Sequence, residues 1–436
     1  MENSATAVYE RLESAVRSYC RACPAEFDRA SGSYLFDVSG RAYLDFIAGC
    51  GALNYGHNEP SMKAALLDYV AGDGVSMTLD FHSRAKTEFL RAFDRCVLRP
   101  RGLDYRLQFT GPTGSNAVEA ALKLARKKTG RSRVVAFTNG FHGVSLGALA
   151  ATGNGHHRGA FESQLHDVHR AAYDGYLGPD LDTAEMLDRM LSDPSGGIGP
   201  IAAVLFEPIQ GEGGLNCASP EWAQRVCAVA RRHGALVIVD EIQSGCGRSG
   251  DFFAFEGLGI EPDVVTLAKS LSGAGLPMSM VLLAPELDAW SPGEHNGTFR
   301  GNAHAFVTAR AALETFWSDD AFASDVRRKA AVLRRRLDVL AAETGGRVKG
   351  RGLMSGLDVG DGDVAQAIRA GCLEEGLLLE LCGPHDEVVK LLVPLTIADA
   401  DLDRGLSILE SVVRTRVPPR RVSPARSIEA PEPVLS

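Results

Sequence analysis

An acidic and an amino side chain each follow a short apolar segment of this chain. Asp240 closes the run ALVIVD, and Lys269 follows the run VVTLA at residues 264–268. Both runs are rich in β-branched residues, which is typical of strands buried on both faces of a parallel sheet. Open α/β sheets bind ligands at the carboxyl ends of their strands. We therefore expect the carboxylate and the amine at one edge of one sheet.

This pair of groups suits pyridoxal 5′-phosphate. A lysine forms a Schiff base with the aldehyde of this cofactor, and an acid that pairs with the pyridine nitrogen keeps it protonated, so that the ring accepts electrons. A single lysine after a strand is more often an ordinary surface amine. The prediction therefore depends on the other motifs of the chain.

A phosphate site is indicated by residues 106–130, RLQFTGPTGSNAVEAALKLARKKTG, which predict a strand, a tight loop and a helix. The first turn of a helix has unpaired N–H groups, and its dipole favours an anion. Gly114, Ser115 and Asn116 stand at this helix start. The segment lacks the GK[ST] ending of a P-loop and the GxGxxG of a dinucleotide site.

Strands and helices alternate across residues 106–284, which predicts a doubly wound, mostly parallel sheet. The fold class is therefore α/β. We predict an N-terminal arm and small-domain segment at residues 1–58 and a large cofactor-binding domain at 59–315. A small α+β domain at 316–416 and a disordered tail at 417–436, rich in Pro, Ser and charge, complete the chain.

Several motifs in order resemble the class III (ω-amino acid) aminotransferases, which are pyridoxal phosphate enzymes of fold type I. They are EPIQGEGG, DEIQSGCGRSGDFFAFE and TLAKSLSGAGLP, which begin at residues 207, 240 and 266. Within the class, residues 109–131, 137–154, 293–302 and 388–397 are most similar to diaminobutyrate–2-oxoglutarate aminotransferases. The resemblance covers roughly residues 19–413.

The resemblance implies roles for individual residues. Lys269 and Asp240 would be catalytic. Thr298 would reach the cofactor phosphate of a neighbouring subunit, which implies a homodimer with shared sites and leaves a tetramer open. The other expected cofactor contacts are Phe141 stacked on the ring, the adjacent His142, Gln243 at the 3′-oxygen, and Glu207 as a brace.

The expected substrate contacts are Tyr55 and the Gly49–Gly51 turn, which lie in one Gly- and Asn-rich loop, and the pair Glu212 and Lys390. In related enzymes the acid at position 212 pairs with an arginine and gates between two substrates. This chain has Lys390 there, and lysine cannot make the bidentate contact of arginine with a carboxylate. The substrate carboxylate is thus held through Lys390 or another residue such as Arg17, Arg248 or Arg300.

The predicted reaction moves an amino group between glutamate/2-oxoglutarate and aspartate 4-semialdehyde/L-2,4-diaminobutyrate. Other class III enzymes, acting on ornithine, acetylornithine, 4-aminobutyrate or a polyamine, share the catalytic residues. An aminomutase or decarboxylase on the same fold is a second alternative. A nicotinamide dehydrogenase lacks support because GxGxxG is missing, and a catalytically idle binding protein would not need Lys269, Asp240 and Gln243.

Composition limits the remaining classes of function. The 436 residues carry a net charge of −9, which disfavours nucleic acid as a partner. No apolar run reaches the roughly 18 to 20 residues that span a bilayer, and the N-terminus has no signal-peptide core, so we expect a cytoplasmic enzyme that does not bind membranes. Nine scattered cysteines indicate reduced thiols. The Cys20–Cys23 spacing has no second pair, and we expect no metal site.

Overall fold

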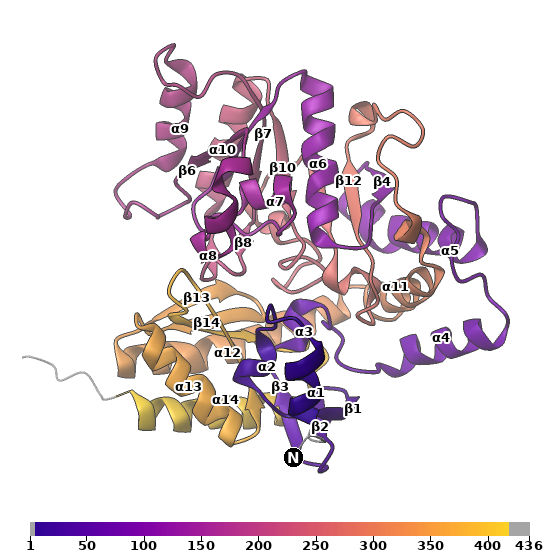
Figure 1. The fold of residues 1–436 in the computed structure, drawn as a ribbon, viewed down its shortest axis with the longest axis vertical. Helices are drawn as coiled ribbons and strands as arrows, with labels where there is room; N and C mark the ends of the chain where they lie inside the picture. The colour runs from indigo at the N-terminus through magenta and orange to yellow at the C-terminus, as the bar shows by residue number, and fades with distance from the viewer. Residues whose placement is uncertain (1–4, 418–436) are drawn as a thin grey trace, which may run out of the picture.

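The computed structural model describes residues 5–417. Figure 1 shows two lobes: an upper one built on a large sheet, and a lower one in which the indigo N-terminal strands lie beside the orange and yellow C-terminal elements. The tail predicted at 417–436, apart from Val417, and the first four residues lie outside the described residues.

The large sheet has seven strands in the order β4-β12-β11-β10-β7-β5-β6, and among them only β12 runs antiparallel to its neighbours. The prediction of a mostly parallel sheet is confirmed. The strands are β4 (Arg106–Phe109), β5 (Arg133–Phe137), β6 (Val168–Ala171), β7 (Ile201–Phe206), β10 (Leu236–Asp240), β11 (Val264–Leu267) and β12 (Met280–Leu283).

Alternation along each strand gives this sheet a core on both faces. In β5, Val134 and Ala136 pack on the face covered by α6 and α7, whereas Val135 and Phe137 pack on the opposite face. The helices around the sheet are α4 (Pro60–Ala71), α5 (Arg84–Phe93), α6 (Gly114–Thr129), α7 (Leu146–Ala151), α9 (Thr183–Ser192), α10 (Pro220–Arg232) and α11 (Ala303–Phe316).

The second lobe joins the two ends of the chain. Strands β1 (Phe27–Ser31), β2 (Tyr34–Asp37) and β3 (Ala42–Asp45) form the predicted meander, and β15 (Leu377–Leu378) adds to β3 in parallel. The other sheet has the order β13-β14-β17-β16. Its strands and the helices are β13 (Arg347–Arg351), β14 (Met354–Asp358), β16 (Glu380–Cys382), β17 (Val388–Leu392), α12 (Ala321–Thr344), α13 (Gly362–Glu374) and α14 (Asp399–Arg416).

Capping residues set several helix starts. Ser219 caps α10 by accepting from Trp222 N, and Pro220 is its first residue, as the sequence predicts. Helix α4 begins at Pro60, one residue after Glu59, whose side chain caps it by accepting from Met62 N. The short elements are α1 (Ala5–Leu12), α2 (Tyr19–Ala22), α3 (Ala48–Gly51), α8 (Gly155–Arg158), β8 (Ile209–Gln210) and β9 (Asn216–Cys217). Within residues 5–417, no helix has the length and apolarity needed to cross a bilayer.

Candidate active site

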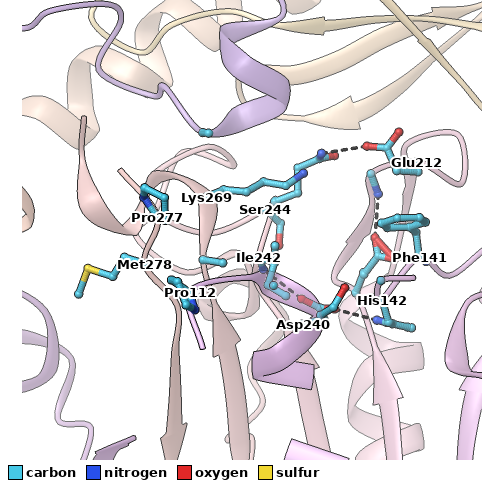
Figure 2. Close-up of a pocket in the computed structure, with 18 of the residues that line it drawn as sticks. Pro112, Phe141, His142, Glu212, Asp240, Ile242, Ser244, Lys269, Pro277 and Met278 are labelled. Carbon is cyan, nitrogen blue, oxygen red and sulfur yellow. Dashed lines mark hydrogen bonds and ion pairs between the residues drawn. The ribbon is translucent and has the colours of Figure 1, made fainter. Parts of the chain in front are cut away.

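A cavity of about 350 Å³ opens at the carboxyl ends of the parallel strands of the large sheet. Figure 2 shows Asp240 and His142 at its base, Phe141 on one side and Lys269 extending across it. The residues predicted for cofactor or substrate that line this cavity are Gly114, Ser115, Phe141, His142, Glu207, Glu212, Asp240, Gln243 and Lys269. Because they follow β5, β7, β10 and β11 or begin α6, the sheet topology brings them to one edge.

The floor of the cavity is the group Asp240, His142 and Thr266. Asp240 Oδ2 lies 2.7 Å from His142 Nδ1, and Oδ1 accepts from Thr266 Oγ1 at 3.0 Å and from Ile242 N at 3.1 Å. Asp240 and His142 are each 3% exposed, so no bulk water screens this ion-pairing geometry. The carboxylate is therefore fixed in orientation and aims its charge into the cavity base.

The N-terminus of α6 forms one end of the cavity. Thr113 caps this helix by accepting from Asn116 N at 3.2 Å. Asn116 itself does not line the cavity, because its Oδ1 accepts from Gly111 N at 2.7 Å and contacts His295 Nε2 at 3.2 Å. A Cβ on Gly143 would lie 2.1 Å from Ser115 Oγ, so glycine is required where this loop crosses the helix start.

Lys269 stands two residues beyond β11, with a left-handed φ of 46°. A side chain with a Cβ is strained in this region, by about 1 kcal/mol or more, and such strain gathers at functional sites. Its Nζ lies 3.6 Å from Cys50 Sγ. The lysine is therefore held across the cavity rather than released to the surface.

Glu207 holds the side of the cavity through two backbone contacts. One of its carboxylate oxygens accepts from Phe141 N at 2.8 Å and the other from Gly211 N at 2.9 Å. Burial raises the pKa of Glu207 to about 7, and the Asp240 carboxylate adds to this effect, while His142 opposes it. The acid thereby fixes the backbone that carries the Phe141 ring.

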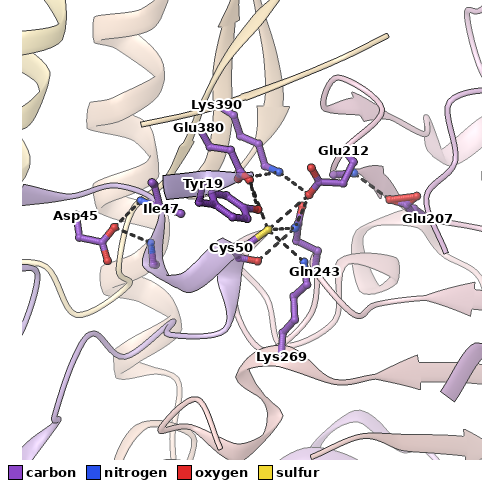
Figure 3. Close-up of polar contacts among 12 residues, drawn as sticks. Tyr19, Asp45, Ile47, Cys50, Glu207, Glu212, Gln243, Lys269, Glu380 and Lys390 are labelled. Carbon is purple, nitrogen blue, oxygen red and sulfur yellow. Dashed lines mark hydrogen bonds and ion pairs between the residues drawn. The ribbon is translucent and has the colours of Figure 1, made fainter. Parts of the chain in front are cut away.

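A second polar group, which we call the distal cluster, consists of Cys50, Glu212, Gln243, Glu380 and Lys390 (Figure 3). Lys390 is fully buried, and its Nζ lies 2.9 Å from Glu212 Oε1 and 3.3 Å from Glu380 Oε2. Gln243 Nε2 donates to Glu212 Oε1 at 2.9 Å. Although burial favours the neutral forms, the pairing with Lys390 and nearby Lys269 lowers the pKa of Glu212 to about 2, and the two carboxylates raise that of Lys390 well above its usual value.

Sequence reasoning pointed to the Gly49–Gly51 turn without singling out the Cys50 thiol, and it missed Glu380. Cys50 Sγ donates toward Glu212 Oε1 at 3.7 Å and Glu380 Oε1 at 3.6 Å. The thiol reaches them because Ala48, Gly49, Cys50 and Gly51 all have positive φ, which makes a left-handed turn. The glycines at 49 and 51 were the available signal for that turn.

Other predicted residues lie elsewhere. Tyr55 does not line the cavity: it is 3% exposed, its ring stacks on Phe316 and its hydroxyl accepts from Trp317 Nε1 at 2.7 Å. Core packing accounts for this position, and Tyr55 is not among the residues that line the cavity of its own chain. Thr298 is exposed and also lies outside the cavity.

The three alternative arginines do not line the cavity either. Arg17 pairs with Glu10 at 2.9 Å, and Arg300 with Asp80 at 2.6 Å. Arg248 is fully buried and donates to Asn54 and to the carbonyl oxygens of Leu353 and Val393. Among Lys390 and these three arginines, Lys390 is the one that pairs with a residue lining the cavity, Glu212.

Comparison with known proteins gives the class. The family model described as aminotransferase class-III matches residues 17–413. The chain is 55% identical over 409 residues to the diaminobutyrate–2-oxoglutarate transaminase of Vibrio cholerae, covering 93% of this chain and 99% of that protein. It is 51% identical over 414 residues to the enzyme of that name from Halomonas elongata, covering 93% and 98%.

A solved structure agrees with this result. The crystal structure of the ornithine aminotransferase of Toxoplasma gondii superposes with a TM-score of 0.79 at 27% identity, covering 94% of each chain. This chain therefore belongs to the class III aminotransferases and has their α/β fold, fold type I, with a large domain and a small α+β domain.

Enzymes of this class use pyridoxal 5′-phosphate, and the cavity fits it. The start of α6 offers free N–H groups for a phosphate, the floor offers a carboxylate for a ring nitrogen, and Phe141 offers a flat face. The Gln243 amide is bound at its nitrogen, while its buried Oε1 has no partner among the described residues. One end of this amide is thus free toward a ligand.

Proposed function

We propose that the chain transfers an amino group between glutamate/2-oxoglutarate and aspartate 4-semialdehyde/L-2,4-diaminobutyrate. The observation that carries this proposal is the Glu212–Lys390 ion pair. Glu212 lines the cavity that holds Lys269, and Lys390 contacts Glu212. Two chemically different substrates must use one cavity, and a pair that can open and close adapts its charge to both. The transaminases of Vibrio cholerae and Halomonas elongata carry the same activity in their names.

Glutamate has a carboxylate beside its reacting carbon, whereas the reacting carbon of 2,4-diaminobutyrate is a CH₂ group. When glutamate binds, its carboxylate displaces Glu212 from Lys390 and takes the ammonium as its partner. When diaminobutyrate binds, Glu212 returns, so that the buried ammonium of Lys390 keeps a counter-ion. An unpaired buried charge costs several kcal/mol, roughly 3 to 5, which sets the energy scale of this gate.

The cofactor, when bound, supplies a carbonyl carbon for the amine and a ring that accepts the electron pair of the broken C–H bond. Lys269 Nζ would remove the proton from the substrate carbon that bears the amine and would deliver it to the former carbonyl carbon on the other side of the shared nitrogen, because it is the basic group that reaches across the cavity. Asp240, oriented by His142 and Thr266, would pair with the ring nitrogen. Phe141 would exclude water from one face of the ring, and Gln243 would bind the ring oxygen.

The phosphate site extends the proposal to a homodimer. Gly114 and Ser115 bind the phosphate from one subunit, and Thr298, exposed and outside its own cavity, completes it in the neighbouring subunit. Sedimentation at assay concentrations tests this: we expect a dimer, and a monomer with full activity would refute the shared site. A cytoplasmic location remains a prediction, and so do the domain limits at residues 58, 315 and 416.

Absorption between 300 and 500 nm tests the assignment directly. Purified protein with pyridoxal phosphate is expected to show a band near ~420 nm that L-glutamate or L-2,4-diaminobutyrate shifts toward ~330 nm. Lys269→Ala is expected to abolish steady turnover. A protein that stays colourless after cofactor is added, or a Lys269→Ala variant with steady turnover, would contradict the proposal.

A further inference from the structure

The distal cluster contains more negative charge than its gate needs. Glu212 alone is sufficient to pair with Lys390, yet Glu380 also points at the same ammonium. Glu380 is 6% exposed, and the Tyr19 hydroxyl donates to its Oε1 at 2.7 Å from the other end of the chain. Its Oε2 receives no hydrogen bond of good geometry from any residue between 5 and 417. This oxygen lies 3.3 Å from Lys390 Nζ, so two buried or half-buried carboxylates share one ammonium, which is a costly arrangement.

In the chain without cofactor, the charges of this region balance. Glu212 and Glu380 face two ammonium groups, Lys390 within the cluster and Lys269 beside Cys50. Cys50 is neutral, because burial raises the pKa of its thiol. When Lys269 is committed to the cofactor, its nitrogen no longer serves as a free ammonium. The cluster then holds two carboxylates and one ammonium, a surplus of one negative charge.

We infer that Glu380 is a specificity-determining residue that makes the enzyme select amine substrates carrying a second ammonium group. This inference rests on the proposed function and names the feature of the substrate that the distal cluster recognises. The substrate ammonium replaces the charge that Lys269 gives up. It contacts Glu212, which lines the cavity, and Glu380 acts on it from behind Cys50 through its charge.

The distances agree with a short diamine. Cys50 Sγ lies 3.6 Å from Lys269 Nζ, whose place on the cofactor the reacting nitrogen would take, and 3.6 Å from Glu380 Oε1. Four single bonds separate the two nitrogens of 2,4-diaminobutyrate, a span of about 5 Å when extended. A hydrogen bond of about 2.8 Å beyond that brings the second ammonium within reach of the acidic pair. A monoamine of equal length leaves the surplus charge unpaired.

The test compares L-2,4-diaminobutyrate with 4-aminobutyrate, which differ only in the second amino group. We expect wild-type holoenzyme to prefer diaminobutyrate in kcat/KM, and Glu380→Gln, which keeps the size and removes the charge, to lower this preference about 10-fold or more. Tyr19→Phe, which loosens Glu380, changes the preference in the same direction by a few-fold. Glu374→Gln, an exposed acid on α13, leaves it unchanged.

Binding without turnover gives a second readout. In the Lys269→Ala background with cofactor, calorimetry measures the dissociation constants of both amines, and Glu380→Gln is expected to weaken diaminobutyrate selectively. The glutamate half-reaction, whose substrate brings no second ammonium, is expected to stay within about 3-fold of wild type. An equal loss in both half-reactions identifies Glu380 as merely structural and overturns the inference.

The outcomes separate the inference from the proposed function. Wild-type enzyme that prefers diaminobutyrate, with an unchanged preference in Glu380→Gln and Tyr19→Phe, contradicts the inference alone. Wild-type enzyme that uses 4-aminobutyrate as well as diaminobutyrate contradicts both the inference and the proposed substrate. If neither amine gives a half-reaction, the proposed amino-group transfer itself is contradicted.

Discussion

The floor of the cavity and the distal cluster lie on opposite sides of Lys269 and are built differently. The floor takes Asp240, His142 and Thr266 from positions beside three strands of one sheet, and it contains one carboxylate held by neutral or weakly basic donors. The distal cluster takes its members from an N-terminal turn, two loops of the large lobe and two strands of the small lobe, and it contains three charged groups within contact distance.

This difference separates reaction from selection. The floor is a buried set of hydrogen bonds that would serve every substrate alike, because the proposed function gives it contact with the cofactor only. The distal cluster contains an ion pair, which the proposed function requires to open for glutamate, and a strained left-handed turn. Substitutions in the floor should therefore affect every substrate alike, whereas substitutions in the distal cluster should distinguish one substrate from another.

The largest effect is expected from Asp240→Asn. An amide cannot keep the ring nitrogen protonated, so proton removal should slow by about 10²- to 10³-fold for glutamate and for diaminobutyrate alike. Half-reactions followed by absorption measure both rates, and the absorption of bound cofactor serves as the control for occupancy. Rates within a few-fold of wild type, or a loss confined to one substrate, would remove Asp240 from the role given to the floor.

Substitution of Lys390 tests whether a change in the distal cluster affects one substrate more than the other. Lys390→Met leaves the half-buried Glu212 and the buried Glu380 without their cation, so we expect the free energy of unfolding to fall by about 3 to 5 kcal/mol. The KM for glutamate should rise about 10- to 100-fold, with a smaller change for diaminobutyrate. Lys390→Arg keeps the charge and is the matched control. Equal changes for both substrates would contradict the gate.

The same contrast explains what the sequence could predict. Residues 106–284 alternate between strand and helix so regularly that the order of strands, and with it the meeting of Asp240, Phe141 and Lys269, follows from topology rules. The capped start of α6 was predictable for the same reason. These are local patterns whose consequences extend over one sheet.

The distal cluster could not be predicted in this way. Cys50 reaches it only because consecutive left-handed residues turn its side chain toward Lys269, while Tyr55, five residues later, points into the core. Glu380 reaches it because β16 pairs with β17 so that Glu380 lies opposite Lys390. Such contacts depend on register and on a backbone conformation that residue types alone do not specify.

The two regions should also respond oppositely to pH. Burial raises the pKa of Glu241, the residue after Asp240, to about 7 from 4.5, so the folded protein favours its protonated form. The stability it contributes is present below pH ~4.5 and is lost as the pH rises to ~7. Glu212, with a pKa of about 2, contributes stability above pH ~4.5 that is lost as the pH falls toward ~2.

Glu241→Gln isolates the contribution of Glu241 to the pH dependence of stability. Unfolding in denaturant from pH 4.5 to 8 should show a wild-type free energy that decreases by up to roughly 3 kcal/mol more than that of the variant. The amide keeps an acceptor for Phe255 N, which Glu241 Oε1 binds at 2.8 Å. Parallel pH profiles for the two proteins would show that Glu241 does not titrate in this range.

The smallest catalytic effect is expected from Tyr55→Phe, which tests whether substrate recognition extends beyond the distal cluster. Its hydroxyl accepts from Trp317 Nε1 inside the core, and Tyr55→Phe leaves that buried N–H without a partner. The expected cost is about 1 to 2 kcal/mol of unfolding free energy, with kcat and KM for both substrates unchanged within about 2-fold. Because Cys50 and Tyr55 share one loop, a selective change in KM for either substrate in Tyr55→Phe would extend the recognition surface beyond Cys50. Unchanged kinetics with lowered stability would limit the recognition surface to the left-handed turn at residues 48–51 and to Glu212 and Glu380.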